Sequence, residues 1–166
     1  MRTVDRVSIG APIDRVFAAA RDVERWPTIL AHYRWVRFVG SSPPVPLSAT
    51  AEKGNWVGRV EMAAWRPFGV LKYPTWWVSE MTVVPAAREV RYRHVEGITR
   101  GMEVVWRMFE RDGGGSVTVE IVHEWRGPAW PVIGRAAANL VIGPVFIHGI
   151  ASRTLAGIKR FVEGGR

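Results

Sequence analysis

Two histidines on strand-like segments are the side chains of this chain best suited to move protons near neutral pH. In "VTVEIVHEWR" (117–126) successive side chains alternate faces, so His123 and Trp125 look the same way as the valines. In "EVRYRHV" (89–95) the same alternation puts His94 on the apolar face. Because imidazole titrates close to neutral pH, His94 and His123 are the candidate catalytic acid and base. The alternative is two histidines whose ring nitrogens are satisfied within a packed core.

The spacing of the turns predicts which residues lie opposite these histidines. A turn soon after His94 places this residue across from Met102. The glycine-rich turn "RDGGGS" (111–116) places His123 across from Met102 or Val104. Both imidazoles then lie at one end of the same sheet face, with their backbones roughly 10 Å apart.

Aromatic side chains and methionines gather around the two histidines in this arrangement. A largely apolar space with a few polar groups at one end is the usual anatomy of a small-molecule site. Methionine can form an adaptable wall of such a site, although it also fills gaps in ordinary cores. Trp26 and Trp35 are expected to pack the short helices instead. We expect the ligand-binding residues to be His32, Tyr33, Trp56, Met62, Trp77, Met102, Trp106, Trp125, Phe146 and His148.

Sequence motifs of metal, nucleotide and nucleophilic chemistry are absent. Two strand histidines can approach one zinc ion, but no third ligand has signature spacing and there is no H-E-x-x-H. The chain has no cysteine, no G-x-S-x-G turn, no G-x-G-x-x-G turn and no P-loop. We therefore expect neither a metal nor a cofactor, and the sequence offers no candidate nucleophile.

Alternating and helical patterns divide the chain into a first strand, two short helices, a run of strands and a C-terminal helix. Pro12 stands where a helix can begin, and "DVERWPTIL" (22–30) is a second helical or turn segment. Short connections between consecutive strands predict an antiparallel meander. The strands are expected at 2–10, 32–40, 55–65, 75–84, 88–95, 101–110 and 116–126.

The last part of the chain has a helical period. Apolar residues recur at steps of three and four from Ile133 to Val162, which predicts a long helix with one buried face. Gly143 and Pro144 should kink this helix or split it in two. The stretch "LVIGPVFI" (140–147) is apolar on every side, so the sheet, a loop, a ligand or another subunit must cover it.

Composition favours one domain, residues 1–166, with a sizeable core. The net charge is +8, yet the arginines are scattered and often alternate with apolar residues. This pattern is typical of the solvent face of strands, so we expect no nucleic-acid partner, and a surface that favours acidic ligands or an anionic membrane. The N-terminus lacks the apolar core of a signal peptide, and we expect a cytoplasmic protein.

Several stretches resemble the START-like (SRPBCC) superfamily in its polyketide cyclase/dehydrase branch: "APIDRVFAAARDVERWP", "HYRWVRF", "RHVEGITRGMEVVWRM", "VEIVHEW" and "GPVFIHGIASRTLAGIKRF". The resemblance implies an α+β helix-grip fold. In that fold a curved antiparallel sheet of six or seven strands wraps around a long C-terminal helix, with two short helices after the first strand. Cyclase members fold and dehydrate a poly-β-keto chain in the cavity between sheet and helix. The resemblance extends to the fold and cavity, and not to a catalytic assignment.

Three hypotheses for function follow. The first is a polyketide cyclase/dehydrase-type enzyme in which one histidine moves a proton at an enolising carbon. The second is a non-catalytic carrier of a lipid, quinone or other apolar ligand, loaded by peripheral contact with a membrane. The third is an interaction protein that forms a homodimer through "LVIGPVFI". All three share an apolar or aromatic binding surface, and the sequence does not decide between the first two.

Overall fold

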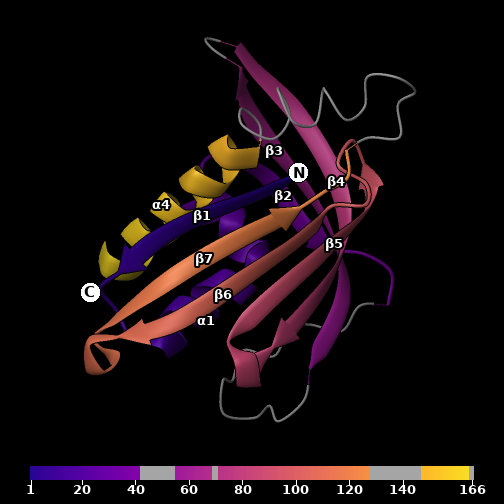
Figure 1. Ribbon diagram of the computed structural model, residues 1–166. Helices are drawn as coiled ribbons and strands as arrows, with labels where there is room; N and C mark the ends of the chain where they lie inside the picture. Colours follow the sequence, from indigo (N-terminus) through magenta and orange to yellow (C-terminus); the bar gives the residue numbers. More distant parts are fainter. Residues whose placement is uncertain (42–54, 69–70, 128–146, 165–166) are drawn as a thin grey trace.

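A single sheet of seven antiparallel strands with helices on one face forms the described part of the molecule (Figure 1). The computed structural model describes residues 1–41, 55–68, 71–127 and 147–164. The strands are β1 (Arg2–Ile9), β2 (Tyr33–Phe38), β3 (Trp56–Phe68), β4 (Leu71–Val84), β5 (Glu89–Gly97), β6 (Glu103–Arg111) and β7 (Ser116–Glu124). The helices are α1 (Ile13–Arg21), α2 (Trp26–Ile29) and α4 (His148–Gly164), with short 3₁₀ turns at Val23–Arg25, Pro85–Ala87 and Asp112–Gly114.

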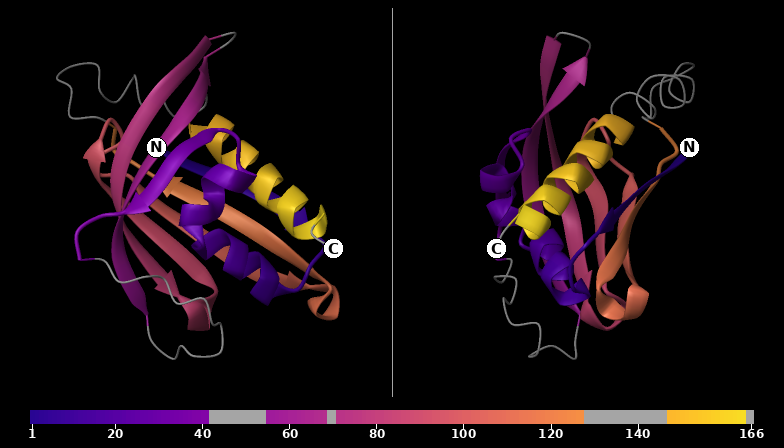
Figure 2. Two further views of the ribbon diagram at one scale, coloured as in Figure 1. Left: turned by 180° about the vertical axis from the view of Figure 1, so that it is seen from behind. Right: turned by 90° about the vertical axis from the view of Figure 1, so that its left-hand side faces the viewer.

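The strand order is β1-β7-β6-β5-β4-β3-β2, so every strand after β1 lies beside its neighbour in the chain. Among the strands of the described ranges only the first pairs out of sequence, with β7, and it forms the edge of the sheet beside α4. Figure 2 shows the sheet curving around α4, with α1 and α2 on the same side. The expected helix-grip architecture is therefore confirmed, with seven strands.

The core lies between the concave face of the sheet and the helices. In α1 the buried apolar residues are Val16, Phe17, Ala19 and Ala20, and Pro12 occupies the cap position where the helix was expected to begin. In α4 the buried apolar side chains follow the expected helical spacing, at Ala151, Leu155, Ile158 and Val162. The last turns of α4 are tied to the end of β1, since Lys159 Nζ donates to the Ser8 carbonyl at 2.6 Å and the Gly10 N–H donates to Glu163 at 2.8 Å.

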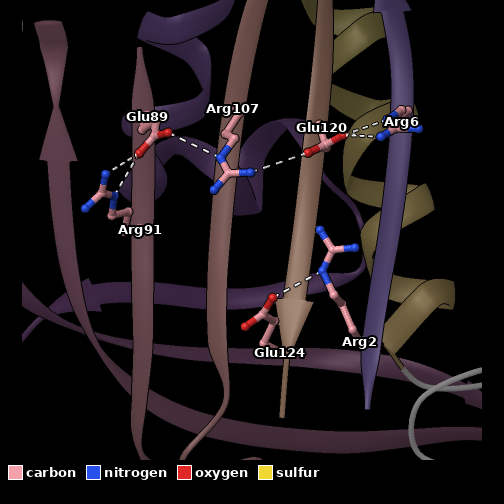
Figure 3. Close-up of polar contacts among 7 residues, drawn as sticks. All are labelled: Arg2, Arg6, Glu89, Arg91, Arg107, Glu120 and Glu124. Atoms are coloured by element: carbon pink, nitrogen blue, oxygen red, sulfur yellow. Dashed lines mark hydrogen bonds and ion pairs between the residues drawn. The ribbon is translucent and has the colours of Figure 1, made fainter. Parts of the chain in front are cut away.

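The outer face of the sheet carries rows of paired charges (Figure 3). Glu120 on β7 accepts from Arg6 on β1 at 2.6 Å and lies 3.8 Å from Arg107 on β6. Arg107 also reaches Glu89 on β5 at 3.3 Å. In each pair the arginine side chain is partly or largely exposed and the carboxylate is largely buried. The consequence of these pairs is electrostatic, because carboxylates interrupt the positive charge on this face, as the alternating sequence pattern indicated.

Most expected strand boundaries differ from the structure by one to four residues. The fourth strand begins at Leu71 rather than at residue 75, because it pairs along its whole length with β3. The last strand ends at Glu124 rather than at residue 126. The expected helix break at Gly143–Pro144 and the candidate residue Phe146 lie outside the described residues. No helix within the described ranges is long and apolar enough to cross a membrane.

Candidate ligand-binding site

A cavity of about 60 Å³ lies between the concave face of the sheet and α4. Residues from six strands, from α2 and from α4 line it, so the whole fold is needed to build it. The aromatic and imidazole side chains are Trp26, Tyr33, Trp77, Tyr92, His94, Trp106 and His123. The remaining described lining residues are Met62, Met102, Val104, Ile121, Ile147, Ile150, Ala151 and Thr154.

The rings form a continuous arc around the cavity. Trp26 lies 5.5 Å from Trp106 and 5.2 Å from Tyr33, measured between ring centroids. Tyr33 lies 6.3 Å from Trp77, which stacks on His94 at 5.9 Å with an interplanar angle of 12°. Such an arc provides large flat apolar surfaces whose polarised edges and faces suit another aromatic ring.

Both candidate catalytic histidines face this cavity, and the predicted register is confirmed. His123 pairs with Val104, and the His94 N–H donates to the Met102 carbonyl at 2.9 Å. A threonine hydroxyl contacts each ring: Nδ1 of His94 lies 2.6 Å from Oγ1 of Thr99, and Nδ1 of His123 lies 3.4 Å from Oγ1 of Thr3. Because a hydroxyl can donate or accept, these contacts orient the imidazoles and are compatible with either tautomer.

Tyr92 brings a hydroxyl group into the apolar part of the cavity. Its side chain is buried, and its oxygen has no hydrogen-bond partner among the described residues. Burial, with a smaller effect from Tyr33, raises the pKa of the Tyr92 phenol well above its usual range. The hydroxyl therefore stays protonated and can donate to a group placed in the cavity.

The structure brings most of the expected sheet residues together. Tyr33, Met62, Trp77, Met102 and Trp106 line the cavity with the two histidines. Four other expected residues lie elsewhere in the described fold: His32, Trp56, Trp125 and His148.

Trp125 lies apart because the strand ends one residue before it. Alternation of faces ceases to apply beyond Glu124, and the Trp125 indole N–H donates to the Arg100 carbonyl at 3.0 Å. Its ring borders a separate surface pocket with Met1 and Arg2. Trp56 packs edge-on against Phe38, with centroids 5.3 Å apart, at the other end of the core.

His148 lies at the start of α4 and faces the edge strand. Its Nδ1 contacts the carboxylate of Asp5, which is buried while the His148 side chain is 63% exposed. Burial raises the pKa of Asp5, and the neighbouring His148 partly offsets this effect. His148 thus belongs to a contact between α4 and β1 rather than to the cavity wall.

His32 lies just outside the cavity, on the far side of Thr154. Its Nε2 is 2.9 Å from Oγ1 of Thr154, which lines the cavity from α4. Burial lowers the pKa of His32 to about 4, and the positive charge of Arg153 contributes to the same shift. His32 is therefore neutral at physiological pH and can both donate and accept a hydrogen bond.

Eight described lining residues were not among those expected from the sequence, and three of them carry aromatic or polar side chains: Trp26, Tyr92 and Thr154. Tyr92 shares a strand face with His94, so parity alone was a usable signal. Trp26 was expected to pack the short helices, and it does donate its indole N–H to the Ala19 carbonyl at 3.1 Å, but its ring also reaches the cavity. Thr154 lines the cavity because of the way α4 packs on the sheet. The local spacing of residues in the sequence does not specify this packing.

The volume of the cavity limits the size of the ligand that it can hold in this structure. Pockets for drug-sized ligands measure roughly 300 to 1,000 Å³. A ligand of that size therefore requires the lining side chains to move apart, and the long flexible side chains of Met62 and Met102 are suited to this. Within the described ranges no three side chains of the His, Asp or Glu type cluster as metal ligands would.

A curved antiparallel sheet that grips a C-terminal helix, with a largely apolar cavity between them, defines a START-like helix-grip protein. The chain belongs to the polyketide cyclase/dehydrase and lipid transport family, whose family model matches residues 9–143.

Solved structures share this fold over nearly the whole chain. A protein from Thermus thermophilus, TTHA0849, is 18% identical, with a TM-score of 0.73 and 99% of each chain covered. The Zhui aromatase/cyclase from Streptomyces sp. R1128 is 19% identical, with a TM-score of 0.69, over 99% of this chain and 97% of that one. A START superfamily protein from Mycobacterium smegmatis is 11% identical, with a TM-score of 0.63, over 99% and 95% of the two chains.

Proposed function

We propose that this protein binds an apolar or aromatic small molecule that carries at least one carbonyl or hydroxyl group, in the manner of a polyketide cyclase/dehydrase. The observation that carries the proposal is the buried Tyr92 hydroxyl, which has no partner among the described residues and lines a cavity of aromatic rings. A buried hydroxyl without a hydrogen bond costs free energy. A ligand oxygen that accepts a hydrogen bond from the Tyr92 hydroxyl removes that cost. Binding of ligands that carry such an oxygen is therefore favoured.

The proposed chemistry is an aldol cyclisation followed by loss of water. His94 or His123 takes a proton from a carbon that lies between two carbonyl groups. The resulting enolate carbon forms a bond to the carbon of another carbonyl group further along the chain. The oxygen of that carbonyl takes the proton back from the imidazolium. A further proton on the adjacent carbon and the new hydroxyl then leave as water. Tyr92 supports these steps by donating to the oxygen on which negative charge develops.

The family description and the arrangement of the rings both support this chemistry over simple packing of a core. A poly-β-keto chain becomes flat and aromatic as it cyclises, and the arc from Trp106 to His94 offers flat partners for such a product. The threonine contacts at Nδ1 hold each imidazole in a defined orientation towards the cavity.

Binding of a neutral fused-ring hydroxyketone, 1,8-dihydroxyanthraquinone, tests the proposal through quenching of tryptophan fluorescence. We expect saturable binding to the wild type and its loss in Val104→Trp, which fills the cavity. Val57→Trp is the matched control, because Val57 is 58% exposed on β3 and does not line the cavity. Equal binding by both folded variants would show that the cavity is not the site.

Carriage of a lipid or quinone in the cytoplasm, with peripheral contact at a membrane, is the competing proposal. Mass spectrometry of organic extracts of the freshly purified protein distinguishes the two. A carrier holds its cargo through purification and releases it unchanged, whereas an enzyme that releases its product gives a clean extract. A lipid recovered from the wild type and from Val57→Trp, but not from Val104→Trp, would favour the carrier.

A further inference from the structure

A surface groove of about 380 Å³ lies on the opposite side of Thr154 from the cavity. It is formed by the connection between α2 and β2, by β3 and by α4. Its apolar surface comes from Leu30, Ala31, Ala156 and the ring of Trp65, and its charged border from Arg153 and Arg160. The groove is thus apolar at its base and cationic at its rim.

The two arginines lie on one face of α4. They are seven residues apart, which is close to two helical turns, or about 10 Å along the axis. Both are exposed, and neither makes an ion pair with another described residue. The nearby carboxylate of Glu163 is engaged by Lys159 and the Gly10 N–H. The positive charge at the rim is therefore not neutralised within the described fold, in contrast to the paired arginines of the outer sheet face.

One hydrogen bond connects the lining of this groove with the lining of the cavity. His32 lines the groove, Thr154 lines the cavity, and the two side chains are joined at 2.9 Å. Tyr33, next in the chain, lines the cavity with its ring centroid 4.8 Å from that of His32. This hydrogen bond therefore bridges the lining of the groove and the lining of the cavity.

We propose that the groove and the cavity form one two-part site for a small amphiphilic acid: its carboxylate or phosphate binds Arg153 and Arg160, and its apolar body passes between His32 and Thr154. Guanidinium groups match the oxygens of such anions in charge and in geometry. This inference rests on the proposed function, because it assigns the apolar body to the cavity. It adds two points to that function. The ligand is an acid rather than a neutral ketone, and it enters the cavity through the groove.

The hollow that the two arginines border favours a monomeric acid over a membrane surface. Its lining includes apolar side chains that can contact the chain of a single ligand molecule, whereas a flat bilayer is met by protruding cations. A ligand whose anionic head is bound in the groove also has its apolar chain next to the contact between His32 and Thr154.

The test compares dodecanoate with 1-dodecanol, both below their aggregation limits, by quenching of tryptophan fluorescence. The groove variant is Arg153→Gln/Arg160→Gln, and the charge-matched control is Arg93→Gln/Arg126→Gln, two exposed arginines outside the groove. We expect the wild type and the control to bind dodecanoate about tenfold more tightly than dodecanol. The groove variant should lose this advantage and bind dodecanol as the wild type does. Val104→Trp should weaken the binding of both molecules.

Each contrary outcome is separable from the others. Equal affinity of the wild type for the acid and the alcohol, or full binding of dodecanoate by the groove variant, overturns the inference. If Val104→Trp still abolishes binding in that case, the proposed function stands. Dodecanoate binding that needs the arginines but is unchanged by Val104→Trp overturns the two-part site, and the anthraquinone test of the cavity then decides the proposed function separately. Arginine-dependent sedimentation with phosphatidylglycerol vesicles, without binding of monomeric dodecanoate, overturns the inference in favour of membrane contact.

A second measurement does not depend on fluorescence. An anion seated beside Arg153 offsets the charge that disfavours protonation of His32. Titration of the His32 ring by NMR should therefore shift to higher pH when dodecanoate is present, and dodecanol should not have this effect. An unchanged His32 titration under saturating dodecanoate contradicts binding at the groove.

Discussion

His94 stacks on Trp77 with the ring centroids 5.9 Å apart and the ring planes 12° from parallel. A register shift between Val78 and Ser79 makes this contact, because it places Ser79 opposite His94 and Trp77 opposite Gly97. The hydroxyl of Thr99 holds Nδ1 of the same imidazole at 2.6 Å. The candidate acid or base is thus fixed by a ring on one strand and by a hydroxyl in the following turn.

The first prediction concerns the two candidate catalytic histidines and the hydroxyl that holds the His94 ring. His94→Ala should abolish turnover of a polyketone surrogate and leave folding and ligand binding nearly intact, and His123→Ala should behave similarly. Thr99→Val removes the hydroxyl at constant size, so it should cost about 1 kcal/mol of unfolding free energy and shift the pH–rate profile. Urea unfolding and steady-state rates measure these effects. Loss of folding in both histidine variants would mean that the imidazoles serve the core instead.

The second prediction concerns the Tyr92 hydroxyl. Tyr92→Phe loses no hydrogen bond to a described residue, so the unfolding free energy should not fall. Binding of 1,8-dihydroxyanthraquinone should weaken about threefold to tenfold, which is the value of one neutral hydrogen bond. Binding of the parent hydrocarbon anthracene should not change. Equal losses for the two ligands would assign the effect to altered packing.

The third prediction concerns the pH dependence that His32 contributes. The folded state lowers the pKa of His32 from 6.5 to about 4, so between these values the unfolded chain binds more protons. The stabilising contribution is therefore present above about pH 6.5 and is lost as the pH falls towards 4. Wild-type stability should fall more steeply between about pH 7 and pH 5 than that of His32→Asn. Parallel curves in denaturant titrations would contradict the shift.

The fourth prediction concerns two glycines with positive φ on either side of the turn that follows His94. At Gly97 (φ 93°) an added Cβ would lie 2.5 Å from the Trp76 carbonyl oxygen and 2.9 Å from Cα of Trp77, whereas at Gly101 (φ 82°) it would meet nothing within 4 Å. Gly101→Ala should cost about 1 kcal/mol of unfolding free energy from the backbone conformation alone. Gly97→Ala should cost clearly more and disturb the Trp77–His94 stack. Equal costs, measured by urea unfolding, would show that the backbone contact is relieved without strain.

Much of the sheet was predictable because it depends on local rules. Side-chain alternation and short turns put His94 across from Met102 and His123 across from Met102 or Val104, and the structure selects Val104. These predictions succeed because a hairpin contact involves residues that are near in sequence. The buried stripe from Ala151 to Val162 was likewise readable from the helical period. The same rules failed at Trp125, where the strand had already ended.

Sequence alone therefore determined the order of elements, the shared sheet face of His94 and His123, and the position of each histidine opposite the neighbouring strand to within one alternative. Tertiary structure alone decided that Trp26 reaches the cavity, that His148 turns to Asp5, and that His32 meets Thr154 across 122 positions of the chain. The physical reason is that these contacts depend on how α2 and α4 seat against the curved sheet. That seating minimises exposed apolar surface over the whole fold, and no local spacing encodes it.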